Sequence, residues 1–65
     1  MHAIIYSFNS TGIDYVILNN SFEMVKKGYA LDADIKYINN TSKMKDKIAI
    51  YFKQIGFENA TLIEM

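Results

Sequence analysis

The sequence predicts an α+β fold, a small two-layer sandwich with one or two helices on one face of an antiparallel or mixed sheet. Three observations support this. Apolar residues recur with helical spacing before Gly56, runs rich in β-branched and aromatic residues lie near both ends, and clusters of Asn, Ser and Thr divide the chain. A length of 65 residues fits one domain, residues 1–65. The predicted element order is ββαβαβ, and βαβαβ is the alternative.

The N-terminal third predicts a hairpin. Residues 2–8 are rich in Ile and aromatic residues, which favour a strand. Residues 9–12 predict a loop in which Gly12 supplies a positive φ, and residues 13–18 the returning strand. The alternative is one helix over residues 13–27, because apolar residues between Tyr15 and Tyr29 are spaced three and four apart. The hairpin is favoured because that helix would begin with β-branched residues and contain Asn19-Asn20-Ser21.

Two short elements are expected next. Residues Phe22 to Lys27 predict a short helix that Ser21 caps and Gly28 ends. Residues Ala33 to Asn39 are predicted to form a strand.

The C-terminal third gives the clearest pattern. One helical stripe predicts a helix over residues 43–55, formed by Met44, Ile48, Tyr51, Phe52 and Ile55. Gly56 suits a left-handed residue after the helix, with Phe57 making the accompanying apolar contact. Residues Asn59 to Met65 predict a final strand.

Composition excludes several classes of site. The chain has no cysteine, which excludes disulfides and thiolate metal sites, and its single histidine, His2, makes a zinc site unexpected. We therefore predict no metal and no cofactor. Zero net charge and the absence of arginine argue against binding through nucleic-acid phosphates. Without a long apolar run or a basic N-terminal region, we expect a cytoplasmic protein that does not bind membranes.

No catalytic group is evident, so we expect no enzymatic activity. His2 lies far from the centre of the sequence, and nucleophilic catalysis needs a base beside the nucleophile. Asp32 and Asp34 would lie on one side of a strand, where they could share a cation, but an exposed turn is the favoured interpretation.

The outward side of the helix over residues 43–55 is the predicted partner-binding surface. Ile50 lies in the middle of this polar side, where an aliphatic residue among lysines suits an acidic partner or a second copy, although an isolated exposed Ile is the favoured interpretation. The predicted surface comprises Lys43, Asp46, Lys47, Ile50, Lys53 and Gln54. Lysines at the start of the helix oppose its dipole, which indicates an anion site at Thr41, Ser42 and Lys43, although a solvated lysine face is the favoured interpretation.

The function expected from these features is protein binding. Phe, Tyr, Met, Ile, Asn and Lys, all encoded by AT-rich codons, make up more than half of the chain, which favours a phage or mobile-element origin. We expect an inhibitor or regulator of a host protein, such as a defence nuclease or a toxin, that acts in the host cytoplasm. The alternatives are a nucleic-acid-binding accessory protein and an oligomer that sequesters a nucleotide or another anion. A thin core also favours a homodimer.

Overall fold

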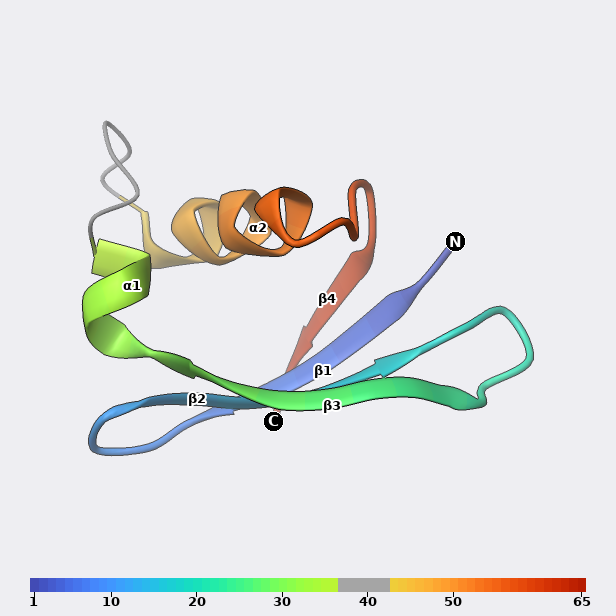
Figure 1. Ribbon diagram of the computed structural model, residues 1–65, viewed down its shortest axis with the longest axis horizontal. Helices are drawn as coiled ribbons and strands as arrows, with labels where there is room; N and C mark the ends of the chain where they lie inside the picture. The colour runs from blue at the N-terminus through green and yellow to red at the C-terminus, as the bar shows by residue number, and fades with distance from the viewer. Residues whose placement is uncertain (37–42) are drawn as a thin grey trace.

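The computed structural model describes residues 1–36 and 43–65. Its elements, in chain order, are β1 (Ala3–Phe8), β2 (Gly12–Leu18), β3 (Met24–Leu31), α1 (Asp32–Lys36), α2 (Met44–Gln54) and β4 (Thr61–Glu64). The strands form one mixed sheet in the order β3-β2-β1-β4, and both helices lie on the same side of it (Figure 1). The predicted α+β class is therefore confirmed, with the element order βββααβ in place of the predicted ββαβαβ or βαβαβ.

The first hairpin forms as predicted, which rules out the alternative helix over residues 13–27. Strands β1 and β2 pair antiparallel, from Ala3 opposite Leu18 to Phe8 opposite Ile13. The Asn9 side-chain oxygen accepts hydrogen bonds from the amides of Thr11 and Gly12, both at 3.0 Å, and so holds the turn.

Gly12 has a different role from the one predicted. Its φ is not positive, because Gly56 is the glycine with that conformation among the described residues. A Cβ at Gly12 would lie 2.0 Å from the carbonyl oxygen of Ala30 on β3. Gly12 is therefore needed for the close approach of two backbones rather than for a left-handed turn.

The predicted helix from Phe22 to Lys27 is wrong, because β3 occupies this part of the chain. The Asn19 side-chain oxygen accepts hydrogen bonds from the amides of Ser21 (2.9 Å) and Glu23 (3.0 Å), so Ser21 lies in a second hairpin turn and caps no helix. β3 then pairs antiparallel with β2 from Leu31 opposite Gly12 to Met24 opposite Leu18, with a register shift that leaves Val25 without a partner on β2. A six-residue helix is too short to be stable by itself, whereas the strand gains a ladder of backbone hydrogen bonds.

The strand predicted from Ala33 to Asn39 is also wrong where it can be compared, because Asp32–Lys36 form α1. Residues 37–39 lie outside the described residues. Asp32 and Asp34 occupy the first turn of α1, where carboxylates interact favourably with the helix dipole, and Ile35 is buried in the core. Two residues apart on a helix, the carboxylates do not face each other, so the shared-cation geometry is lost.

The predictions for the C-terminal third are confirmed within one or two residues by α2 and β4. The Phe57 amide donates to the Phe52 carbonyl oxygen (2.8 Å) and the Gly56 amide to that of Lys53 (3.1 Å), a Schellman motif. Gly56 has φ +103°, and Phe57 packs against the core, as predicted. This turn leads into β4, which pairs parallel to β1 with Leu62 opposite Ile4.

The core lies between the sheet and the two helices. The rings of Tyr15 on β2 and Phe52 on α2 meet edge to face, with centroids 4.9 Å apart and planes at 83°. The buried apolar residues are Ile4, Tyr6, Ile13, Tyr15, Ile17, Ala30, Ile35, Ile48 and Phe52. All the strand residues in this list point to one side of the sheet, so the helices cover that face alone.

Candidate interaction surfaces

The predicted partner-binding surface lies on the outer side of α2. Its members Lys43, Asp46, Ile50, Lys53 and Gln54 are exposed and Lys47 is half-buried. The opposite side of α2 carries Ile48 and Phe52, both buried against the sheet. Ile50 is 36% exposed, which is modest for the centre of an interface. The structure thus places these side chains together on one surface, and their role in binding stays a prediction.

The predicted anion site is only partly described. Thr41 and Ser42 lie outside the described residues. Lys43 is the N-cap of α2, with extended backbone and no side-chain hydrogen bond to the helix end. Asp46 in the first turn and Lys53 in the last turn both complement the helix dipole. Anion binding at this position stays a prediction.

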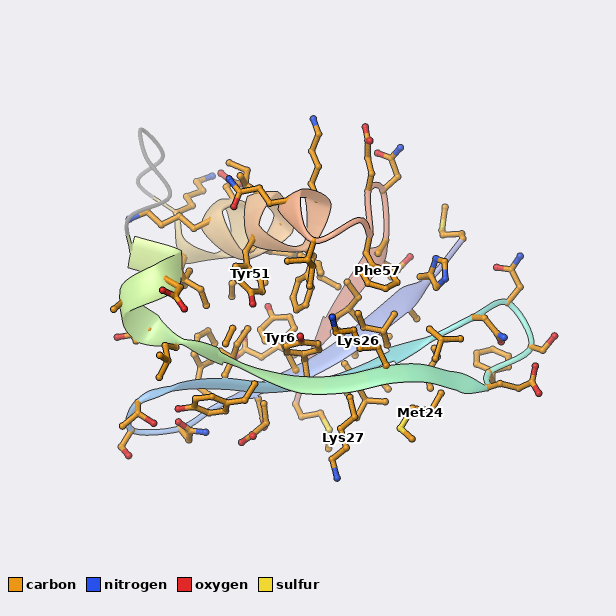
Figure 2. All side chains as sticks on the ribbon, in the orientation of Figure 1. Tyr6, Met24, Lys26, Lys27, Tyr51 and Phe57 are labelled. Carbon is orange, nitrogen blue, oxygen red and sulfur yellow. The ribbon has the colours of Figure 1, made fainter. Side chains whose placement is uncertain are left out.

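A larger apolar surface lies on the side of the sheet that the helices leave uncovered. Figure 2 shows Met24 and Lys27 pointing away from the helices, whereas Tyr6, Lys26 and Phe57 lie between the sheet and the helices. We call this surface the open sheet face. By strand alternation and register it comprises Ala3, Ile5, Ser7, Asp14, Val16, Leu18, Met24, Lys27, Tyr29, Leu31, Thr61 and Ile63.

The register aligns these side chains in rows across the sheet. The central row runs from Ile63 on β4 through Ile5 and Val16 to Lys27 on β3. The row beside it contains Leu18 and Met24. Ile63 is 44% exposed and Met24 is 61% exposed. A sheet covered on one side normally alternates apolar with polar residues, so aliphatic rows on the other side indicate an interaction surface.

Sequence reasoning missed the open sheet face although a signal for it was present. Ile4-Ile5 and Val16-Ile17-Leu18 are uninterrupted apolar runs, and such runs are typical of strands with both faces buried. The helix predicted from Phe22 to Lys27 concealed it, because Met24 and Lys27 were not assigned to a strand.

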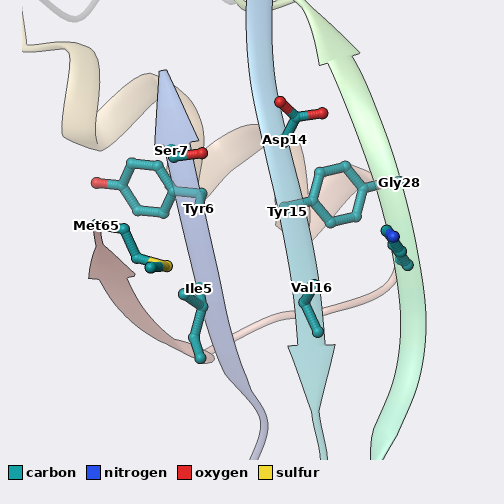
Figure 3. A pocket seen from close by; sticks show the side chains of 9 residues that line it. Ile5, Tyr6, Ser7, Asp14, Tyr15, Val16, Gly28 and Met65 are labelled. Atoms are coloured by element: carbon teal, nitrogen blue, oxygen red, sulfur yellow. The ribbon is translucent and has the colours of Figure 1, made fainter. Parts of the chain in front are cut away.

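A shallow hollow of about 130 Å³ lies on this face (Figure 3). Its lining includes Ile5, Asp14, Val16, Lys27 and Met65. Pockets for small-molecule ligands usually have volumes of about 300–1,000 Å³, so this hollow is too small for that role. It is close to the roughly 150 Å³ of a benzene-sized cavity and can therefore accept one apolar side chain.

The shifted pKa values belong to the core rather than to either surface. Burial raises the pKa of Tyr6, and nearby Glu64 raises it further. Burial also raises the pKa of Tyr15, with smaller contributions from the proximity of Tyr51 and a hydrogen bond to it. Both tyrosines face the helices, so these shifts reflect packing and do not mark a reactive group.

Residues 1–36 and 43–65 contain no group of three or more His, Asp or Glu side chains that could hold a metal ion. His2 is half-buried, and its ring packs edge-on against Phe57 with centroids 5.2 Å apart. No helix in the described part of the chain is long and apolar enough to cross a membrane. Comparisons of the chain with protein-family models, curated proteins and solved structures find no match.

Proposed function

We propose that this chain is a non-enzymatic protein-binding module that inhibits or regulates its target. The observation that carries the proposal is the open sheet face, where Ile5, Val16 and Ile63 form an aliphatic row that neither α1 nor α2 covers. Covering these side chains with a partner removes apolar surface from water, which is the main driving force of protein association. Such a mechanism needs no reactive group.

The proposed target is a host protein, because the AT-rich composition favours a phage or mobile-element gene. The outer side of α2 is a second proposed contact surface. Exposed Ile50 supplies an apolar anchor there, and Lys43 and Lys53 supply positive charge at the rim. Charged residues at the rim of an interface accelerate encounter with a partner of opposite sign, so this surface suits an acidic target. Such a target would be met in the host cytoplasm.

The test is affinity co-purification of the tagged chain from a low-GC bacterial host, followed by rebinding of the purified partner. Three variants are compared: Val16→Asp on the open sheet face, Ile50→Asp on α2, and Ser10→Asp in the exposed β1–β2 loop as the control. We expect one host protein in stoichiometric amount that survives Ser10→Asp. Loss with Val16→Asp or with Ile50→Asp identifies the surface that holds it.

Two results would contradict the proposal. One is a partner that binds equally to all three variants, because neither surface would then be in contact with it. The other is an eluate with high absorbance at 260 nm and no protein partner, whose nucleic acid is released by raising the salt concentration. That result would favour the nucleic-acid-binding alternative.

A further inference from the structure

We infer that the open sheet face binds a second copy of this chain, giving a twofold-symmetric dimer with the two sheets packed face to face. The inference rests on the proposed function, because it takes the open sheet face as an interaction surface and names its occupant. With a second copy on that face, the host protein would bind the other proposed contact surface, the outer side of α2. The dimer would leave both α2 helices on the outside, since they lie on the opposite side of each sheet.

The charges on the open sheet face are self-complementary. Among its members, Asp14 and Lys27 are the charged residues, one acid and one base. Lys26 and Glu64 belong to the helix-covered side, because they pair with the buried residues Ile17 and Tyr6. This face therefore has no net charge to repel an identical face.

The positions of these two charges fit a twofold axis. Asp14 pairs with Tyr29, and Tyr29 is two residues from Lys27 along β3. Asp14 and Lys27 are therefore diagonal neighbours, with Cα atoms about 7–8 Å apart. A twofold axis in the plane of the interface, passing between them, places Asp14 of each copy opposite Lys27 of the other. Isologous interfaces need this kind of self-complementarity.

A second copy fits the face better than a partner with a uniformly charged surface. An acidic partner would bring like charge to Asp14, and a basic partner would bring it to Lys27. A second copy of the face brings an opposite charge to Asp14 and to Lys27 at the same time. It also packs one aliphatic row against another. The hollow beside Ile5 and Val16 can accept an apolar side chain from the facing sheet.

The area of the open sheet face limits the expected affinity of the dimer. Four strands about 4.8 Å apart, paired over about six residues, span roughly 20 by 20 Å, a footprint of roughly 400 Å² per copy. Specific interfaces bury about 800 Å² per partner, and weak ones bury less. We therefore expect a weak, reversible dimer.

The experiment is sedimentation velocity over a concentration series from below micromolar to about a millimolar, with charge-reversal variants. Asp14→Lys gives a face with two positive charges, and Lys27→Asp gives one with two negative charges. Each variant alone should have a dissociation constant raised at least about tenfold, since like charges then face each other. An equimolar mixture of the two should form heterodimers about as tightly as the parent chain.

Rescue in the mixture separates an interface from a folding defect. Asp14 also accepts a hydrogen bond from the Asn9 side chain, so Asp14→Lys removes a contact of the first turn, and mixing would not restore it. The inference is overturned if the parent sediments as a monomer throughout the series. It is also overturned if the variants dimerise like the parent, or if the mixture fails to restore the dimer while both variants have the parent's circular dichroism spectrum.

The two proposals fail in distinguishable ways. A monomeric parent whose host partner is lost with Val16→Asp would overturn the dimer and leave the protein-binding function standing. A dimer that follows the charge reversals, together with no host partner in co-purification, would support the dimer and contradict host-protein binding.

Discussion

The ring of Tyr15 lies against Gly28 on the neighbouring strand, so closely that a Cβ at Gly28 would lie 2.5 Å from the Tyr15 hydroxyl oxygen and 2.7 Å from the ring carbon that bears it. Figure 3 shows the ring reaching from β2 towards β3. On the other side the same ring packs against Phe52. Tyr15 thus fills the space that Gly28 leaves and joins the edge strand to α2.

Gly28→Ala should destabilise the fold by about 1–3 kcal/mol, because a packed aromatic ring has to move to admit the methyl group. Urea denaturation followed by circular dichroism would measure the change. The control is the same substitution in a Tyr15→Leu background. There alanine should be neutral or stabilising, since alanine is otherwise preferred to glycine inside a strand. An equal cost in both backgrounds would contradict the role assigned to Tyr15.

Gly56→Ala should lower the free energy of unfolding by about 1 kcal/mol, and the reason differs from that for Gly28→Ala. A Cβ there meets nothing within 4 Å, so the whole cost comes from φ +103°. Gly56→Asn should cost less than Gly56→Ala, because asparagine tolerates left-handed conformations. Thermal unfolding of the two variants gives the comparison, and equal losses would show that the backbone conformation does not set the cost.

Asn19→Ala should destabilise the second hairpin by about 1–2 kcal/mol, because its side-chain oxygen accepts from two turn amides. Ser21→Ala is the matched control in the same turn. A serine that capped a helix would cost about 1 kcal/mol to remove, whereas here the expected loss is close to zero. A large effect of Ser21→Ala with a small effect of Asn19→Ala would contradict this structure of the turn.

Stability should fall at alkaline pH. Burial raises the pKa of Tyr6 and Tyr15 above the value near 10 that tyrosine has in an unfolded chain. From about pH 10 upward the unfolded state therefore binds fewer protons than the folded state, and the free energy of unfolding decreases as the pH rises. Below about pH 10 both states keep these hydroxyl groups protonated, and the contribution is fully present.

Urea denaturation at a series of pH values from 8 to 11 would check this prediction, with a Tyr6→Phe/Tyr15→Phe variant as the comparison. The variant should lose stability less steeply above about pH 10, because these two tyrosine hydroxyl groups are absent. Parallel curves for the parent and the variant would rule out the buried tyrosines as the cause.

The parts of the fold that could be predicted are those whose signals are local. The α2 stripe, its Gly56-Phe57 termination and the loop over residues 9–12 each lie within a dozen residues. All three appear as expected, except that Gly12 does not have the positive φ that was predicted for it. Strand β3 was missed because its pattern depends on a partner. Gly28 looks like a helix end in sequence, and only the pairing with Tyr15 shows why a strand contains a glycine there.

Of the two candidate surfaces, the outer side of α2 could be predicted from the sequence and the open sheet face could not. The outer side of α2 follows from helical periodicity, so its exposed members could be listed in advance. Which residues form the open sheet face depends on the side of the sheet against which the helices pack. The helices pack on the side that carries Tyr15, Ile4 and Ile17, and no single segment of the sequence determines this.

The parallel pairing of β1 with β4 also affects how the chain is made. Strands β1, β2 and β3 form a meander of two local hairpins that can assemble as soon as about 31 residues have left the ribosome. The other edge of β1 pairs with Thr61–Glu64, so its backbone groups on that side have no partner from β4 until those residues have been synthesised. An unpaired edge is where nascent chains aggregate, and the late arrival of β4 makes β1 the vulnerable strand during translation.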